Sequence, residues 1–297
     1  MKFKADELLT TGYFTQLGQL PPLVTQFLPP NFTLPGQPFR QALFLAFAPA
    51  AVDLTTDQVH AAQLSEYLAL AWYLTPPAFS PQDITPTVLA KARARSFAST
   101  YLGMQYVNEV TQVGTPAELS QALIVDAGDL QLAQLRQLTL NYHQELTVAD
   151  YLRAQKHQTG LLGSMIARQA LGFQTRQPDL LNLAGQIGQG VAVAAQLQFE
   201  LEHLADATWF KQRLVTGQYP LTLLFARQTK PGWFSDFFAQ PHQPGPIAFQ
   251  TAQRHCQQAA YQVQDLQGDL LAQAKLDLAA LPLPGLQKQV QRLLDLL

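Results

Sequence analysis

Four side chains that could do chemistry lie within seven residues of one another: Glu200, Glu202, His203 and Asp206. Carboxylates bind hard cations such as Mg²⁺, and a histidine can bind a metal or transfer a proton near neutral pH. The group could therefore form a metal site or an acid/base pair. The surrounding residues predict a helix, however, on which residues 200 and 202 point to different faces. A solvated helix end is the favoured interpretation, and a ligand role for His203 is the alternative.

The sequence around this group has a recognisable order. An apolar helix with several glycines passes through Gln196 into Phe199-Glu200-Leu201-Glu202-His203, and Gly217-Gln218-Tyr219-Pro220-Leu221 follows. This order resembles the second half of the trans-isoprenyl diphosphate synthase (polyprenyl synthetase) family. There a glycine-containing helix runs through a Phe-Gln pair into an Asp-Asp-x-x-Asp cluster, and Gly-Lys-x-Thr-Leu-Pro comes next. Only Glu200 remains acidic among the aligned aspartates, and Gln218 replaces the lysine.

The resemblance extends back to residue 36. Gly36-Gln37-Pro38-Phe39-Arg40 is similar to the family's Gly-Lys-x-x-Arg, and the segment from Tyr151 to Gln158-Thr159-Gly160 is similar to its Tyr-x-x-x-x-x-x-Lys-Thr-Gly. Both lysines are glutamine here. Glu66–Thr75 resembles the helix that leads into the family's first aspartate cluster, whose place is taken by Pro76-Pro77-Ala78-Phe79-Ser80. None of those five side chains is a carboxylate.

The resemblance implies both a fold and a chemistry. The fold is an all-α, isoprenoid-synthase-type helical bundle with a central cavity, across which the helices containing 66–75 and 190–203 face one another. In the family, Mg²⁺ held by the two aspartate clusters, together with Lys and Arg, neutralises a departing diphosphate. The vestigial substrate-binding positions that it implies are Gly36, Arg40, Tyr151, Thr159, Gln196 and Glu200. We expect no metal site and no cofactor, and Mg²⁺ only if the chain is active.

Several of these positions also have a purely structural interpretation. Gly36 could simply form a turn, and Arg40 could make a local ion pair instead of binding an anion. Gln196 could form a hydrogen bond across the bundle. Trp72 and Tyr73, where the family places residues that limit product length, could be core aromatics.

Apolar residues recur at three- and four-residue spacing almost throughout, and no alternating run indicates a strand. The predicted helices are 38–52, 57–74, 86–110, 117–140, 148–172, 179–206, 247–280 and 286–297. Thr147, and Asp179 or the residue before it, are expected N-caps. Segment 229–246 is rich in proline and glycine and predicts a surface loop.

Composition narrows the class of protein. The 297 residues are 47% hydrophobic and 13% charged, which fits one large domain over residues 1–297. A net charge of −2 provides no basic surface for nucleic acid. The single cysteine, Cys256, excludes an intrachain disulfide. No apolar run is long enough to be a transmembrane segment, and the N-terminus lacks a signal peptide, so we expect a cytoplasmic protein.

Coordinated loss of aspartates and lysines predicts a catalytically degenerate member of the family. Such a chain would act in isoprenoid biosynthesis as a homodimer, or as the partner or regulatory subunit in a heterodimer with an active polyprenyl synthase, through apolar helix faces in 86–140. Two alternatives remain open. One is a diverged prenyltransferase, peptide-modifying or short-chain, that uses Glu200, Glu202, His203 and Asp206 as a rebuilt metal site. The other is a non-catalytic protein that binds an isoprenoid diphosphate or a lipid.

Overall fold

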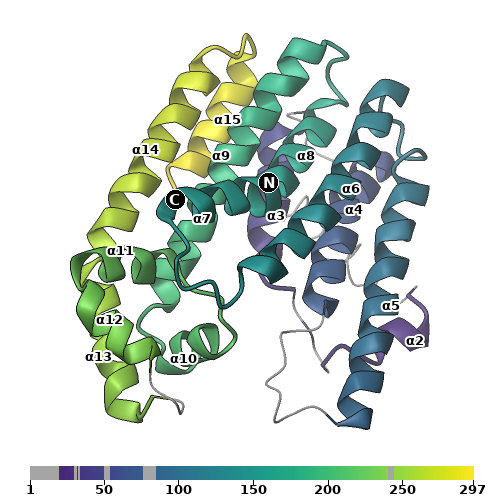
Figure 1. The fold of residues 1–297 in the computed structure, drawn as a ribbon. Helices are drawn as coiled ribbons and strands as arrows, with labels where there is room; N and C mark the ends of the chain where they lie inside the picture. Colours follow the sequence, from purple (N-terminus) through teal and green to yellow (C-terminus); the bar gives the residue numbers. More distant parts are fainter. Residues whose placement is uncertain (1–19, 30–31, 33, 50–53, 76–84, 240–243) are drawn as a thin grey trace.

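The computed structural model describes residues 20–29, 32, 34–49, 54–75, 85–239 and 244–297, and in these ranges it contains helices and no strand (Figure 1). This confirms the all-α prediction. The elements are α2 (Pro22–Thr25), α3 (Gln37–Phe47), α4 (Thr56–Leu74), α5 (Pro86–Glu109), α6 (Ala117–Leu140), α7 (Val148–Gln155), the π-helical turn η2 (Lys156–Gly160), α8 (Leu161–Leu171), α9 (Pro178–His203), α10 (Ala207–Val215), α11 (Leu221–Thr229), α12 (Pro231–Phe238), α13 (Pro246–Gln258), α14 (Ala260–Ala279) and α15 (Pro284–Leu294).

Two clusters of buried apolar side chains hold these helices together. The first joins α3, α4, α5, α6, α8 and α15, and the second joins α7 and α10 to α13. Helix α9 belongs to both, because Ile187 lies in the first cluster and Leu197 in the second. It packs against α8 on one side and α14 on the other (Figure 1). The C-terminal end of α9, where the candidate site residues lie, is therefore held by the second cluster, and the earlier part of the helix by the first.

Helix α4 is deeply buried in the first cluster. It begins with a capping box, in which Thr55 and Gln58 satisfy each other's backbone N–H groups. Every residue from Ala61 to Ala71 is buried. A helix that is buried on all sides lies in the middle of a bundle, and the predicted helix 57–74 is confirmed.

Some predicted boundaries are wrong. The 229–246 segment is not simply a loop, because Pro231 starts α12 and the rings of Phe234 and Phe237 are buried on it. Proline is favoured in the first turn of a helix, so its presence indicated a start as well as a break. Residues 240–243 lie outside the described residues.

Two long predicted helices are divided. The predicted helix 247–280 bends at Ala259 between α13 and α14. Alanine favours helices, so the sequence carried no signal for this bend. The predicted helix 148–172 contains the π turn between α7 and α8. The predicted helix 38–52 ends at Phe47, and residues 50–53 lie outside the described residues.

The predicted helix caps have mixed outcomes. Thr147 is the N-cap of α7, as predicted, with its hydroxyl oxygen accepting from Asp150 N. Helix α9 instead begins at Pro178, and its N-cap Gln177 makes no side-chain bond, so the predicted Asp179 cap is wrong.

No described helix is long and apolar enough to cross a membrane. The single-domain boundary 1–297 and the cytoplasmic location stay predictions.

A buried ion pair joins α3 to α4. Arg40 donates from Nε to Glu66 Oε1 at 3.0 Å and from Nη2 to Glu66 Oε2 at 2.6 Å, and both residues are buried. Its Nη1 donates to the carbonyl oxygen of Pro35 at 2.9 Å. The structure thus contains the local ion pair that was one of the two interpretations of Arg40, and contact with an external anion stays a prediction.

Removing one member of this pair should destabilise the fold strongly. Arg40→Met leaves the Glu66 carboxylate buried without a cation, and we expect it to lower the free energy of unfolding by about 3–5 kcal/mol. The double variant Arg40→Met/Glu66→Leu removes both charges and should lose less than the single variant. Urea unfolding of the three proteins measures this, and a single variant as stable as the parent would contradict it.

Helices α8 and α9 approach at backbone distance. A Cβ atom added to Gly188 would lie 2.5 Å from the carbonyl oxygen of Gly163 and 2.6 Å from the Cβ of Ala167. Gly190, two residues further along α9, has no neighbour closer than 3.9 Å. Glycine is therefore required at 188 by packing, whereas at 190 it only weakens the helix.

The two glycines provide a matched pair for mutation. Gly188→Ala should destabilise the protein by about 1–3 kcal/mol, because the helices must separate. Gly190→Ala should stabilise it by up to about 1 kcal/mol through helix propensity. Thermal unfolding of both variants gives the comparison, and equal effects of the same sign would show that the contact does not constrain α9.

Candidate functional site

Three of the six predicted site residues meet at the C-terminal end of α9. The Tyr151 hydroxyl, from α7, donates to Glu200 Oε1 at 2.5 Å, and Gln196 Nε2, one turn earlier on α9, lies 3.5 Å from the same oxygen. The backbone N–H of Leu221, at the start of α11, donates to Glu200 Oε2 at 3.0 Å. We call these four residues the Glu200 cluster. It joins three helices through one carboxylate.

The Glu200 cluster is shielded from water. Glu200 is 4% exposed and Tyr151 5%. Burial, and secondly the Glu200 carboxylate, raise the pKa of the Tyr151 hydroxyl well above its usual value. The phenol therefore keeps its proton and remains a hydrogen-bond donor to the carboxylate. Its role in this structure is structural support of Glu200.

The remaining members of the group near residue 200 point elsewhere. Glu202 is exposed and accepts from Gln198 Nε2 at 2.8 Å. His203 Nδ1 lies 2.8 Å from the carbonyl oxygen of Phe199, and its ring lies 4.0 Å from the Phe199 ring. Asp206 Oδ1 caps α10 by accepting from the backbone N–H groups of residues 208 and 209. In the described part of the chain no three His, Cys, Asp or Glu side chains are placed to hold a metal ion. The four side chains do not converge in this structure, and the alternative of a rebuilt metal site from these residues stays a prediction.

Three glutamines lie at the positions aligned with lysines of the resembled family, and two of them bond within this chain. Gln158 is buried and donates through Nε2 to the carbonyl oxygen of Ala133 on α6 at 3.2 Å. Gln218 accepts from Arg213 Nη1 at 2.7 Å. Gln37 is buried at the start of α3. Gln158 and Gln218 thus bind a backbone carbonyl and a side chain, and none of the three amides adds a positive charge.

Sequence reasoning overlooked Arg213. Its guanidinium lies 5.3 Å from the centre of the Trp209 ring, and it opposes the rise in the Tyr151 pKa through its charge. Arg213 is therefore a cation whose charge acts on the Glu200 cluster. In the sequence, Arg213 lies between two motifs of the resembled family. It belongs to a short amphipathic helix, α10, that the list of predicted helices omitted.

The other predicted positions are separate from the Glu200 cluster. Thr159, in η2, donates to Gln155 Oε1 at 3.2 Å. Gly36 has φ 73° and is the N-cap of α3, so the turn interpretation applies to it. No hydrogen bond among the described residues joins Gly36, Arg40 or Thr159 to Glu200. Their roles in binding substrate stay predictions.

The C-terminal end of α4 is bound by an arginine. Arg95 on α5 donates to the carbonyl oxygens of Tyr73 at 3.0 Å and Leu74 at 3.2 Å. The ring of Tyr73 packs 4.6 Å from that of Phe32, and both Trp72 and Tyr73 are half-buried. The Pro76–Ser80 segment lies outside the described residues. Helix α8 contacts both α4 and α9. That α4 and α9 face one another across a central cavity stays a prediction.

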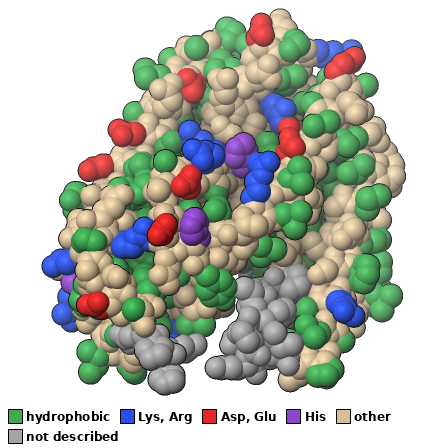
Figure 2. Space-filling model, in the orientation of Figure 1, with side chains coloured by type: hydrophobic (Ala, Val, Ile, Leu, Met, Phe, Trp, Pro, Cys, Tyr) green, Lys and Arg blue, Asp and Glu red, His purple; other side chains and the backbone are tan. Residues whose placement is uncertain are grey.

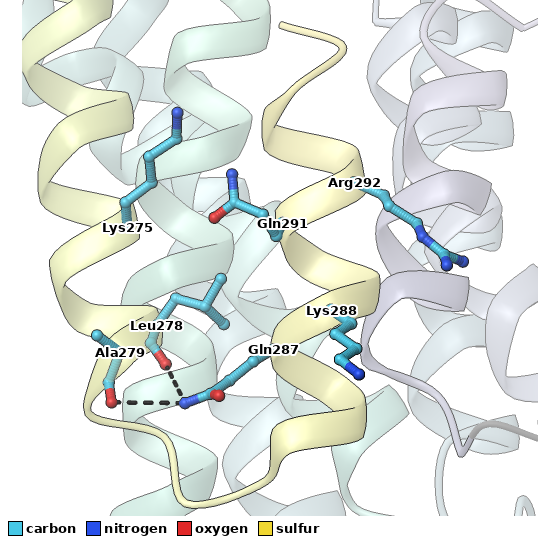
Figure 3. Close-up of a pocket in the computed structure, with 7 residues that line it drawn as sticks. All are labelled: Lys275, Leu278, Ala279, Gln287, Lys288, Gln291 and Arg292. Atoms are coloured by element: carbon cyan, nitrogen blue, oxygen red, sulfur yellow. Dashed lines mark hydrogen bonds between the residues drawn. The ribbon is translucent and has the colours of Figure 1, made fainter.

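A pocket of about 590 Å³ lies elsewhere, between α14 and α15. Figure 3 shows that its cations diverge: the side chain of Arg292 points away from α14, and those of Lys275 and Lys288 extend in different directions. Gln287 Nε2 donates to the carbonyl oxygens of Leu278 and Ala279 at the floor of this pocket. Side chains that diverge do not form an anion site.

Solved structures of several prenyl diphosphate synthases have a similar fold. A geranylgeranyl pyrophosphate synthase from Lactobacillus brevis has a TM-score of 0.79 at 19% identity, covering 98% of this chain and 95% of its own. A polyprenyl synthase from Caulobacter crescentus, complexed with calcium and isoprenyl diphosphate, has 0.73 at 15% identity, covering 98% and 96%. A decaprenyl diphosphate synthase from Rhodobacter capsulatus has 0.71 at 16% identity, covering 98% and 97%.

The chain matches no protein-family model and no curated protein sequence. Similarity at 15–19% identity establishes the fold, and it does so over nearly the whole length of each chain. The resemblance inferred from the motifs is confirmed at that level: the chain has the all-α fold of the polyprenyl diphosphate synthases.

Proposed function

We propose that the chain is a polyprenyl diphosphate synthase-like protein that has lost catalysis and acts in isoprenoid biosynthesis as the partner or regulatory subunit of an active synthase. The engagement of Glu200 supports this most directly. It is the one acidic residue left at the aligned aspartate positions, and the chain itself supplies donors to both of its oxygens. A carboxylate bound in this way is poorly placed to bind Mg²⁺.

Electrostatics favour the same proposal. A diphosphate carries several negative charges, and burying even one unpaired charge costs several kcal/mol. Where the family has lysines, this chain has Gln37, Gln158 and Gln218, and each is buried or already bonded within the chain. Arg40 is paired with Glu66. The groups that would neutralise a departing diphosphate are therefore missing or engaged.

Exposed apolar side chains on α5 and α6 support the proposed association. They are Phe97, Met104, Val125, Leu132, Leu135 and Leu138. Figure 2 shows that the flank formed by α5 carries hydrophobic and uncharged side chains with few charges between them. Exposed apolar surface of this kind marks an interaction site in many proteins. We call these six residues the α5–α6 face, and we propose that it pairs with a second copy or with a synthase.

Loss of catalysis has a direct test. We expect the purified chain to show no Mg²⁺-dependent condensation of isopentenyl diphosphate with an allylic diphosphate, because residues 76–80, 199 and 203 supply no carboxylate. Product formation from radiolabelled isopentenyl diphosphate measures it, with an active synthase as the positive control. Turnover on the order of 1 per second would contradict the proposal. Retention of the labelled diphosphate or its lipid without turnover would instead support a non-catalytic binding protein.

The association can be tested with two leucines that are both exposed on helices. Leu132 lies in the α5–α6 face and is 51% exposed, and Leu276 lies on α14 and is 68% exposed. We expect Leu132→Glu to raise the dissociation constant of the homodimer or heterodimer roughly tenfold to hundredfold, since it buries an unpaired charge. Leu276→Glu should leave it unchanged. Light scattering of the chain, alone and mixed with an active synthase, measures this. A monomer in both samples would remove the partner-subunit proposal.

A further inference from the structure

Two buried carboxylates in the described residues are stabilised in different ways. Glu66 has the guanidinium of Arg40 within 2.6 Å. Glu200 is equally buried, yet no Lys, Arg or His among the described residues lies within ion-pair distance of it. All of its hydrogen-bond donors are neutral: a phenol, an amide side chain and a backbone N–H. A buried charge needs compensation, so these neutral groups must supply it.

The start of α11 provides one part of that compensation. Its N-cap is Pro220, which has no side-chain group that could accept from the first N–H groups of the helix. Helix N-termini carry partial positive charge and unsatisfied donors, and they commonly bind anions. The N–H of Leu221 donates to Glu200 Oε2 from a residue with no exposed surface. A side chain from another helix thus takes the place of a bound anion.

We infer that the Glu200 carboxylate is an internal anion, held in a small anion site that is formed by the Leu221 N–H, the Tyr151 hydroxyl and the Gln196 amide. The site belongs to the folded chain, and its occupant is tethered to α9. Removing the carboxylate therefore leaves a site for a free carboxylate of the same size. This inference stands whether or not the chain pairs with a synthase, because it concerns only how α7, α9 and α11 are joined.

Chemical rescue tests the inference. Glu200→Ala keeps Cβ and removes the rest of the side chain, which has the size and charge of acetate. We expect the variant to unfold at a lower temperature than the parent, and sodium acetate to raise its midpoint by about 2–4 °C relative to sodium chloride at equal ionic strength. Glu202→Ala is the matched control, since it removes an exposed carboxylate from the same helix. Acetate should not shift the control or the parent.

A second variant keeps the inference testable if Glu200→Ala does not fold. Glu200→Gln preserves the shape of the side chain and removes its charge, so we expect a lower unfolding midpoint that acetate does not restore, because the amide fills the space. A Glu200→Gln protein as stable as the parent would overturn the inference, since the charge would then be dispensable. So would a Glu200→Ala protein that responds to acetate no more than Glu202→Ala does.

Discussion

The direct backbone contact between α8 and α9 is the constraint on which the candidate site depends. Gly163 and Gly188 let the two helices touch at their main chains. Helix α9, positioned by this contact, contributes buried side chains to both hydrophobic clusters. With the first two-thirds of α9 held in this way, its last turns project Glu200 between α7 and α11. Any side chain at this contact would displace α9, and with it the residues that α9 contributes to both hydrophobic clusters.

Neutral amides take part in the hydrogen bonds around the candidate site. Gln158 donates to the carbonyl oxygen of Ala133, Gln196 lies 3.5 Å from Glu200 Oε1, and Gln218 accepts from Arg213. A neutral amide loses far less on burial than an ammonium ion. Amides at these positions therefore form hydrogen bonds inside the fold without adding positive charge to it.

Local patterns in the sequence predicted much of the fold and part of the site. The helix 57–74 and the cap at Thr147 follow from short-range signals, and the motif order brought out Tyr151, Gln196 and Glu200. Other features depend on contacts that no local pattern contains. The Leu221 N–H reaches Glu200 across a loop and a whole helix, and the charge of Arg213 acts on Tyr151 only in the folded chain. The bend at Ala259 occurs in a residue that favours an unbroken helix.

The π turn at Lys156–Gly160 sets which neighbour each polar side chain meets. In a regular helix, residues seven apart lie on nearly the same stripe, so Tyr151 and Gln158 would point toward one neighbour. A π-helical turn rotates less per residue than an α-helical turn, so it changes the angle between the two side chains. Tyr151 consequently meets α9, whereas Gln158 meets α6. One irregular turn thus gives two polar side chains seven residues apart different directions. Comparisons of this chain with its structural relatives should therefore align side-chain direction as well as residue number in this segment.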